Sequence, residues 1–240
     1  MNYDFHMNSS LYELLTKLLS TEESKNPAFN YLLNDYTKYH YVMVILGGFA
    51  CISLAVFSIR QFKKLRASDS FISHLKTMRG KALLYLGSLT SFLALTLGII
   101  VIGNLGNALN PKTGFNNSLE MLGNPSHGTK AALLQQTYVE WIQSEKSAVP
   151  DYVSQVISER ISWQLPKALV CLLLLAIFIY LSKLAWNPLL KETLQSGKPR
   201  MRRLFATGVF LSFVCVLLLI MVIANIQGAI APVSLSLFFA

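Results

Sequence analysis

Four long apolar blocks constrain this chain more than any other feature of its sequence. They cover residues 41–59, 82–102, 168–186 and 204–226, and Lys183 is the only charged residue inside them. Each block is long enough to cross the hydrocarbon core of a bilayer as a helix, which takes about 20 residues. Because backbone amides and carbonyls in that core must be paired within the protein, we expect four transmembrane helices in an all-α polytopic membrane protein. Lys183 lies near the end of its block and is expected to reach back to the interface.

The basic residues indicate in which direction the chain crosses the membrane. Only 14% of the 240 residues are charged, against about a quarter in soluble domains, and the formal net charge is +9. The connections 60–81 and 183–203 hold 13 of the 21 lysines and arginines but only 2 of the 12 acidic residues. The positive-inside rule places both connections in the cytoplasm and both chain termini outside. The charge then reflects topology and attraction to the lipid bilayer, and no nucleic-acid partner is predicted.

The two halves of the chain resemble each other. Residues 91–111 and 212–232 align without a gap at an offset of 121, with nine identities. A second match, at an offset of 123, aligns residues 22–29 with residues 145–152. We interpret the matches as a tandem duplication of a two-span unit, with both copies in the same orientation about an axis along the membrane normal. Chance similarity between apolar helices is the alternative interpretation.

This organisation divides the chain into five segments. They are an extracytoplasmic amphipathic segment (1–40), a first two-span repeat (41–111) with the cytoplasmic loop 60–81, an extracytoplasmic loop with amphipathic helices (112–167), a second two-span repeat (168–232) with the cytoplasmic loop 187–203, and an apolar C-terminal tail (233–240). The segments outside the membrane are therefore expected to form an outer cap.

The two outer segments carry apolar stripes. Ser10 and Glu13 fit a capping box, which predicts a helix start there, and leucines then recur at helical spacing. Residues 112–128, rich in Asn, Gly and Pro, are predicted to form turns, and residues 129–144 a helix. The stripes either pack on one another and on the bilayer surface, or bind an extracytoplasmic partner. The candidate outer interaction face consists of Leu11, Leu15, Leu18, Tyr138, Trp141 and Ile142.

Few side chains in the sequence point to chemistry. No span has an ionisable residue far from its ends, which disfavours ion-coupled transport. Asn104 and Asn225 are a candidate polar pair, either lining a pore or joining helices by hydrogen bonds. No nucleophile, phosphate-loop or metal-ligand motif occurs, so no catalytic residue, cofactor or metal site is predicted. His40, with Tyr39 and Arg160, is the one constellation that we single out for mutation.

The sequence therefore predicts a non-enzymatic integral protein of a plasma membrane, of the bacterial inner-membrane type. It is expected to act through its outer cap and bundle, as an interaction protein, a complex subunit or a protective, immunity-type protein. Its partner is then another membrane or extracytoplasmic protein, or a second copy of the chain in a homo-oligomer. The alternative function is a passive channel or small-solute transporter formed by the bundle or its oligomer.

Overall fold

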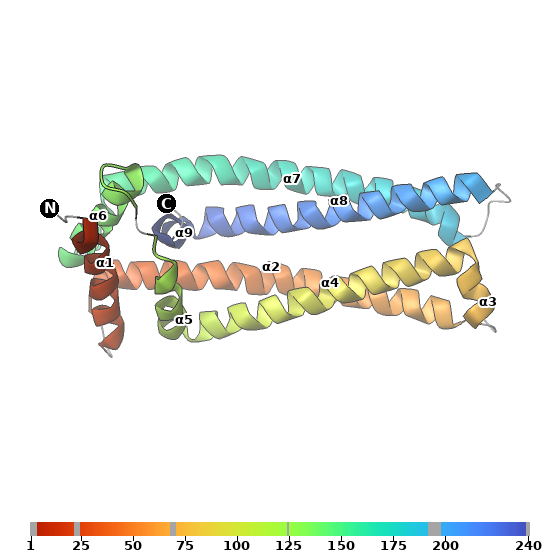
Figure 1. The fold of residues 1–240 in the computed structure, drawn as a ribbon, viewed down its shortest axis with the longest axis horizontal. Coiled ribbons are helices and arrows are strands. Elements are labelled where there is room, and N and C mark those ends of the chain that lie inside the picture. The colour runs from red at the N-terminus through yellow and green to blue at the C-terminus, as the bar shows by residue number, and fades with distance from the viewer. Residues whose placement is uncertain (1–3, 22–24, 68–70, 124, 192–197, 239–240) are drawn as a thin grey trace. The chain divides into compact units, whose positions relative to one another are not determined.

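The computed structural model describes residues 4–21, 25–67, 71–123, 125–191 and 198–238. In order, the elements are α1 (Asp4–Ser20), α2 (Pro27–Arg66), α3 (Phe71–Lys76), α4 (Met78–Leu109), α5 (Pro111–Ser118), the 3-10 helix η1 (Leu119–Met121), α6 (Lys130–Gln143), α7 (Asp151–Lys191), α8 (Lys198–Ile230) and α9 (Pro232–Phe238) (Figure 1). Within these residues, four helices (α2, α4, α7 and α8) are long and apolar enough to cross a membrane. The predicted four-span, all-α fold class is confirmed. Predictions on the remaining residues, including Glu22 and Ser24 and parts of both basic loops, lie outside the described residues.

The first and third spans belong to helices much longer than a bilayer requires. Helix α2 has 40 residues and α7 has 41, so the outer segment before each span continues into it without a break. Asn26 fixes the start of α2, because its side-chain oxygen accepts the backbone N–H of Phe29 at 2.9 Å and Pro27 takes the first helical position. Helix α7 continues through Pro166, and such prolines are tolerated in membrane helices.

Two local predictions for the outer segments are wrong and one is confirmed. Helix α1 begins at Asp4, so Ser10 lies inside the helix instead of starting it. The turns predicted for 112–128 are wrong as far as Met121, where the chain forms helix α5 and η1, and the described residues from 122 to 128 are not helical. Within α5, Gly114 lies under Asn107 and Tyr36, where a Cβ would come within 2.8–2.9 Å of their oxygens. The predicted 129–144 helix is observed as α6.

The chain folds into two compact units. We call the first the cap unit (Met1–Val44, Ile102–Pro166 and Asn225–Ala240) and the second the bundle unit (Ile45–Val101 and Lys167–Ala224). Each of the four long helices contributes residues to both units. The bundle unit thus holds most of the predicted spans, and the cap unit most of the predicted outer segments.

The cap unit has a hydrophobic core built from helices that are far apart in sequence. Its fully or nearly fully buried side chains are Leu11, Leu15, Ala28, Phe29, Leu32, Tyr36, Phe115, Leu119, Leu134, Tyr138, Trp141, Ile142, Val153, Val233, Leu237 and Phe238. The core joins the stripe of α1 to that of α6, and it includes the C-terminal segment, which folds as α9. Burying one such side chain stabilises a fold by about 1.5–3 kcal/mol. The apolar stripes of α1 and α6 are therefore removed from water by packing in the same core.

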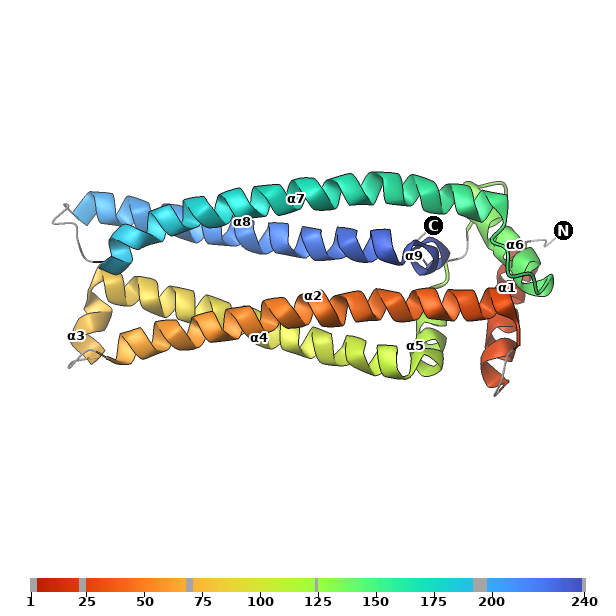
Figure 2. The same cartoon turned by 180° about the vertical axis from the view of Figure 1, so that it is seen from behind.

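Helix α2 packs against α4 in the bundle unit (Figure 2). Ser58 of α2 donates a hydrogen bond to the backbone carbonyl of Gly87 at 2.9 Å, and its Oγ lies 2.6 Å from Oγ of Ser91. The ring of Phe62 covers Gly87, where a Cβ would lie only 3.1 Å from the ring. The glycine therefore allows the close approach of the two helices.

Helix α7 packs against α8 by a similar arrangement (Figure 2). The indole of Trp186 covers Gly208, where a Cβ would lie 2.6 Å from the ring, and its Nε1 donates to Oγ of Ser212 at 3.2 Å. Tyr85 and Phe205 hold the indole on its other sides, at ring-centroid distances of 5.6 Å and 5.4 Å. In both pairs, an aromatic ring of one helix lies on a glycine of the next.

Candidate functional site

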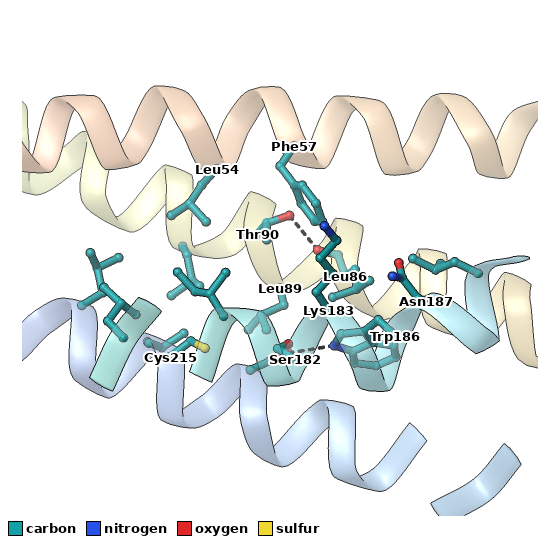
Figure 3. A pocket seen from close by; sticks show the side chains of 17 residues that line it. Leu54, Phe57, Leu86, Leu89, Thr90, Ser182, Lys183, Trp186, Asn187 and Cys215 are labelled. Atoms are coloured by element: carbon teal, nitrogen blue, oxygen red, sulfur yellow. Dashed lines mark hydrogen bonds between the residues drawn. The ribbon is translucent and has the colours of Figure 1, made fainter. Parts of the chain in front are cut away.

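The bundle unit contains a cavity of about 460 Å³ between its four long helices (Figure 3). This volume lies within the about 300–1,000 Å³ that is usual for small-molecule sites. Twelve of the 17 residues that line it are apolar, and seven of these are leucines. No acidic side chain is among the lining residues in the described part of the chain. The cavity is thus apolar in most of its wall, and its one charged side chain is a cation.

The polar lining residues lie at one end of the cavity. Along α7, Leu175 and Ile179 come first, and Ser182, Lys183 and Asn187 follow toward the helix end. The apolar Trp186 and Leu190 line that end as well. Helix α8 enters from the same end, and there Ser212 precedes the apolar Val216 and Leu219. The wall of the cavity therefore changes along the helix axes, from mixed polar and apolar near the basic connections to apolar toward the middle of the spans.

The hydroxyls of Thr90 and Ser212 and the indole of Trp186 form hydrogen bonds within the bundle unit. Ser212 donates to the backbone carbonyl of Gly208 at 2.8 Å while it accepts from Trp186, and Thr90 donates to the carbonyl of Leu86 at 2.6 Å (Figure 3). These groups hold the shape of the cavity and leave little hydrogen-bonding capacity for a ligand.

Lys183 and Asn187 differ from Thr90 and Ser212, and share with Ser182 the lack of a side-chain hydrogen bond to any described residue. Neither side chain has a hydrogen bond or ion pair with any residue that the structure describes. Figure 3 shows Lys183 pointing from α7 into the cavity, toward Phe57 of α2. The side chain of Lys183 therefore lines the cavity, and the expectation that it reaches back to the interface stays a prediction. An unpaired cation between membrane helices is a recognised mark of a binding or transport site.

The predicted outer interaction face lies inside the cap core. Five of its six side chains, those of Leu11, Leu15, Tyr138, Trp141 and Ile142, are buried, and Leu18 packs against them. The Tyr138 hydroxyl lies 2.6 Å from Oγ of Ser236 and donates to the carbonyl of Val233, and burial raises its pKa. A partner could reach these side chains only if the cap opened.

The predicted asparagine pair also lies in the cap unit. Oδ1 of Asn104 is 2.7 Å from Nδ1 of His40, so it links α4 to α2. The ring of Tyr39 packs edge-on against His40 at 5.3 Å, and its backbone carbonyl accepts a hydrogen bond from Gln227 of α8. The structure thus shows Asn104 in an interhelical contact, and Asn225 is half-buried in α8. A pore role for either residue stays a prediction.

A buried carboxylate connects the start of α2 to the C-terminal helix. Oδ2 of Asp35 accepts the backbone N–H of Ser234 at 2.7 Å and its hydroxyl at 2.9 Å. Burial raises the pKa of Asp35, whose side chain is 5% exposed and lies ahead of the predicted span 41–59. The helical patterns do not predict this contact, because its partners are 199 residues apart.

The cavity is not predicted from the sequence, although the sequence contains one signal for it. Lys183 is the only charged residue in the four blocks, and intramembrane charges are functional candidates by default. Asn187, one helical turn later, gave no signal because polar residues are ordinary at span ends. Among the residues that the structure describes, no three His, Cys, Asp or Glu side chains lie together as metal ligands would. Comparisons with models of known protein families, with curated proteins and with solved structures find no match.

Proposed function

We propose that the protein is a non-enzymatic multi-pass membrane protein that binds an amphipathic molecule from the bilayer in the cavity of its bundle unit. One observation carries the proposal: the wall is apolar toward mid-span, and its polar residues, with an unpaired lysine, lie toward the basic connections. An amphipathic molecule in a membrane has the same gradient of polarity. The cap unit, with its own core, then acts as the structural support that joins the ends of the long helices.

The predicted function as an interaction protein remains a second candidate. It is favoured by side chains of the cap unit that stay exposed after the two stripes have packed, such as Tyr12 of α1 and Leu133 of α6. Tyrosine is enriched in protein interfaces, because its ring buries well and its hydroxyl still bonds to water. Under this proposal a membrane or extracytoplasmic protein, or a second copy of the chain, contacts the exposed surface of the cap and leaves its core closed.

The proposed location is a plasma membrane, with the cap unit and both termini on the outer side. The 13 basic residues in the two connections support this orientation. A fluorescent protein that folds only in the cytosol is expected to be dark when fused after Ala240. The same reporter inserted within the 187–203 connection is expected to fluoresce. Fluorescence from the terminal fusion together with a dark insertion would show that the orientation is inverted.

We also propose that the chain arose by duplication of a two-span unit. The element order supports it, because α1, α2, α4 and α5 have the same sequence of short and long helices as α6, α7, α8 and α9. The aligned pairs Gly87/Gly208 and Ser91/Ser212 support it too: each glycine lies under an aromatic ring, and each serine follows one turn later. Unrelated apolar helices have no reason to repeat this arrangement at one offset.

Filling the apolar part of the cavity tests the proposed binding function. Val216 lines the cavity and Leu217, the next residue, is exposed on the outer surface of the bundle unit. Val216→Trp is expected to lower the amount of lipid retained per purified protein by about tenfold, since a clash of about 1.4 kcal/mol already has that effect. Leu217→Trp, the matched control, is expected to leave it unchanged. The lipid is extracted after gel filtration and measured by mass spectrometry.

The fold of both variants is checked by their helical circular dichroism and thermal midpoint. If a folded Val216→Trp protein retains as much lipid as Leu217→Trp, the cavity does not hold the retained lipid and the proposed function is wrong.

A further inference from the structure

The charge of the cavity makes the proposed function more specific. Lys183 is the one charged side chain among the described lining residues, and no described residue neutralises it. Lys183 is an exposed residue of a helix long and apolar enough to cross a membrane, and a cation at that depth is costly without a partner. A ligand of opposite charge lowers that cost. The ligand that fits best is therefore an anion.

The position of Lys183 along α7 indicates which part of the ligand is anionic. It lies eight residues before Lys191, the last residue of the helix, which places it about 12 Å from the helix end. Asn187 lies one turn closer to that end, so the two side chains project from the same helix face. The ammonium and the amide thus lie between the apolar part of the cavity and the basic connections. A headgroup would occupy this level, with hydrocarbon extending toward Leu175 and Val216.

The apolar wall distinguishes a lipid from a free anion. A soluble anion would contact Lys183 and Asn187 and leave the twelve apolar lining residues against water. A phospholipid covers them with its acyl chains. The basic connections at the same end also attract anionic lipids, which raises the local supply of this ligand.

We infer that the cavity selects an anionic phospholipid of the surrounding membrane, with Lys183 pairing with the headgroup phosphate and Asn187 donating a hydrogen bond to it. The inference rests on the proposed function, since it names the class of molecule that the cavity binds. Basic pockets between membrane helices on the cytoplasmic side are known to bind such headgroups. No covalent step is involved.

The test compares two lysines of the same helix. Full-length protein in a neutral detergent is titrated with fluorescent phosphatidylglycerol, which is anionic, and with phosphatidylcholine, which is zwitterionic. Lys183→Gln is expected to weaken binding of phosphatidylglycerol about fivefold, the effect of one lysine near a lipid headgroup, and to leave binding of phosphatidylcholine unchanged. Lys191→Gln, outside the cavity wall, is expected to change neither. Lys183→Arg keeps the charge and is expected to retain the preference for phosphatidylglycerol.

Two results would overturn the inference. One is a loss of phosphatidylglycerol affinity that is equal in Lys183→Gln and Lys191→Gln, because the charge effect would then belong to the whole surface. The other is displacement of phosphatidylglycerol by inorganic phosphate, because the site would then bind a free anion. The proposed function has a separate test: if Val216→Trp abolishes binding of both lipids while Lys183→Gln affects neither, the cavity binds lipid without selecting its charge.

Discussion

Replacing Trp141 by alanine is expected to lower the free energy of unfolding of the cap unit by about 3–5 kcal/mol, the usual cost of removing a large aromatic side chain from a core. Trp141 is 2% exposed, packs against Tyr31 and Tyr138, and donates from Nε1 to the carbonyl of Lys146 at 3.0 Å. The variant leaves a cavity at the contact between α6 and the start of α2. The measurement is the hydrogen-exchange protection of α6 amides, with the thermal midpoint as a second readout.

A second tryptophan of the cap unit provides the control. Trp163 is 65% exposed on α7, so Trp163→Ala removes the same side chain without opening a core and is expected to cost less than about 1 kcal/mol. Equal loss of protection in α6 for both variants would contradict the described core, in which only Trp141 is enclosed.

Replacing Asp35 by alanine is expected to destabilise the cap unit by about 1–3 kcal/mol at neutral pH. The substitution leaves the backbone N–H and the hydroxyl of Ser234 buried without their acceptor, and stranded buried donors cost this much. It also detaches the start of α9 from α2, so protection of α9 amides is expected to fall first. Glu120→Ala, at an exposed acidic residue of the same unit, is expected to have no such effect.

The effect of Asp35→Ala should depend on pH in a defined direction. Burial raises the pKa of Asp35 above its ordinary value of 3.8, although hydrogen bonds from Ser234 lower it in part. The folded cap then binds the proton more tightly than the unfolded chain, so stability decreases as the pH rises from about 3.8 through the raised pKa. The variant lacks this carboxyl group. The difference in the free energy of unfolding between the wild type and Asp35→Ala should therefore be larger near pH 4 than near pH 7. If the loss of unfolding free energy in Asp35→Ala became smaller at lower pH, the folded cap unit would favour the ionised form of Asp35, and this prediction would be wrong.

The four spans could be predicted because hydropathy and length are local properties of a segment. A run of apolar residues long enough for the bilayer must be helical there, whatever its neighbours are. Helix α6 was predictable for a similar reason, since its cap is local: the side chain of Thr129 accepts the N–H of Ala132 three residues later. Helix α5 was missed because Gly114 indicates a turn by composition, and only packing under Tyr36 and Asn107 shows why a glycine is needed there.

Only the tertiary structure shows whether the apolar stripes of the outer segments pack on one another or remain open to an extracytoplasmic partner. Leu15 and Tyr138 have the same helical pattern whether they contact a partner or each other, and only the fold shows that they share one core. The direction of Lys183 was undetermined in the same way, because a flexible lysine can extend toward the interface or along a cavity. The amino-acid sequence thus determines which segments form apolar helices long enough to cross a membrane, because this depends on the composition and length of each segment by itself. The tertiary structure determines which side chains of these segments contact each other, because such contacts join residues as far apart in sequence as Asp35 and Ser234.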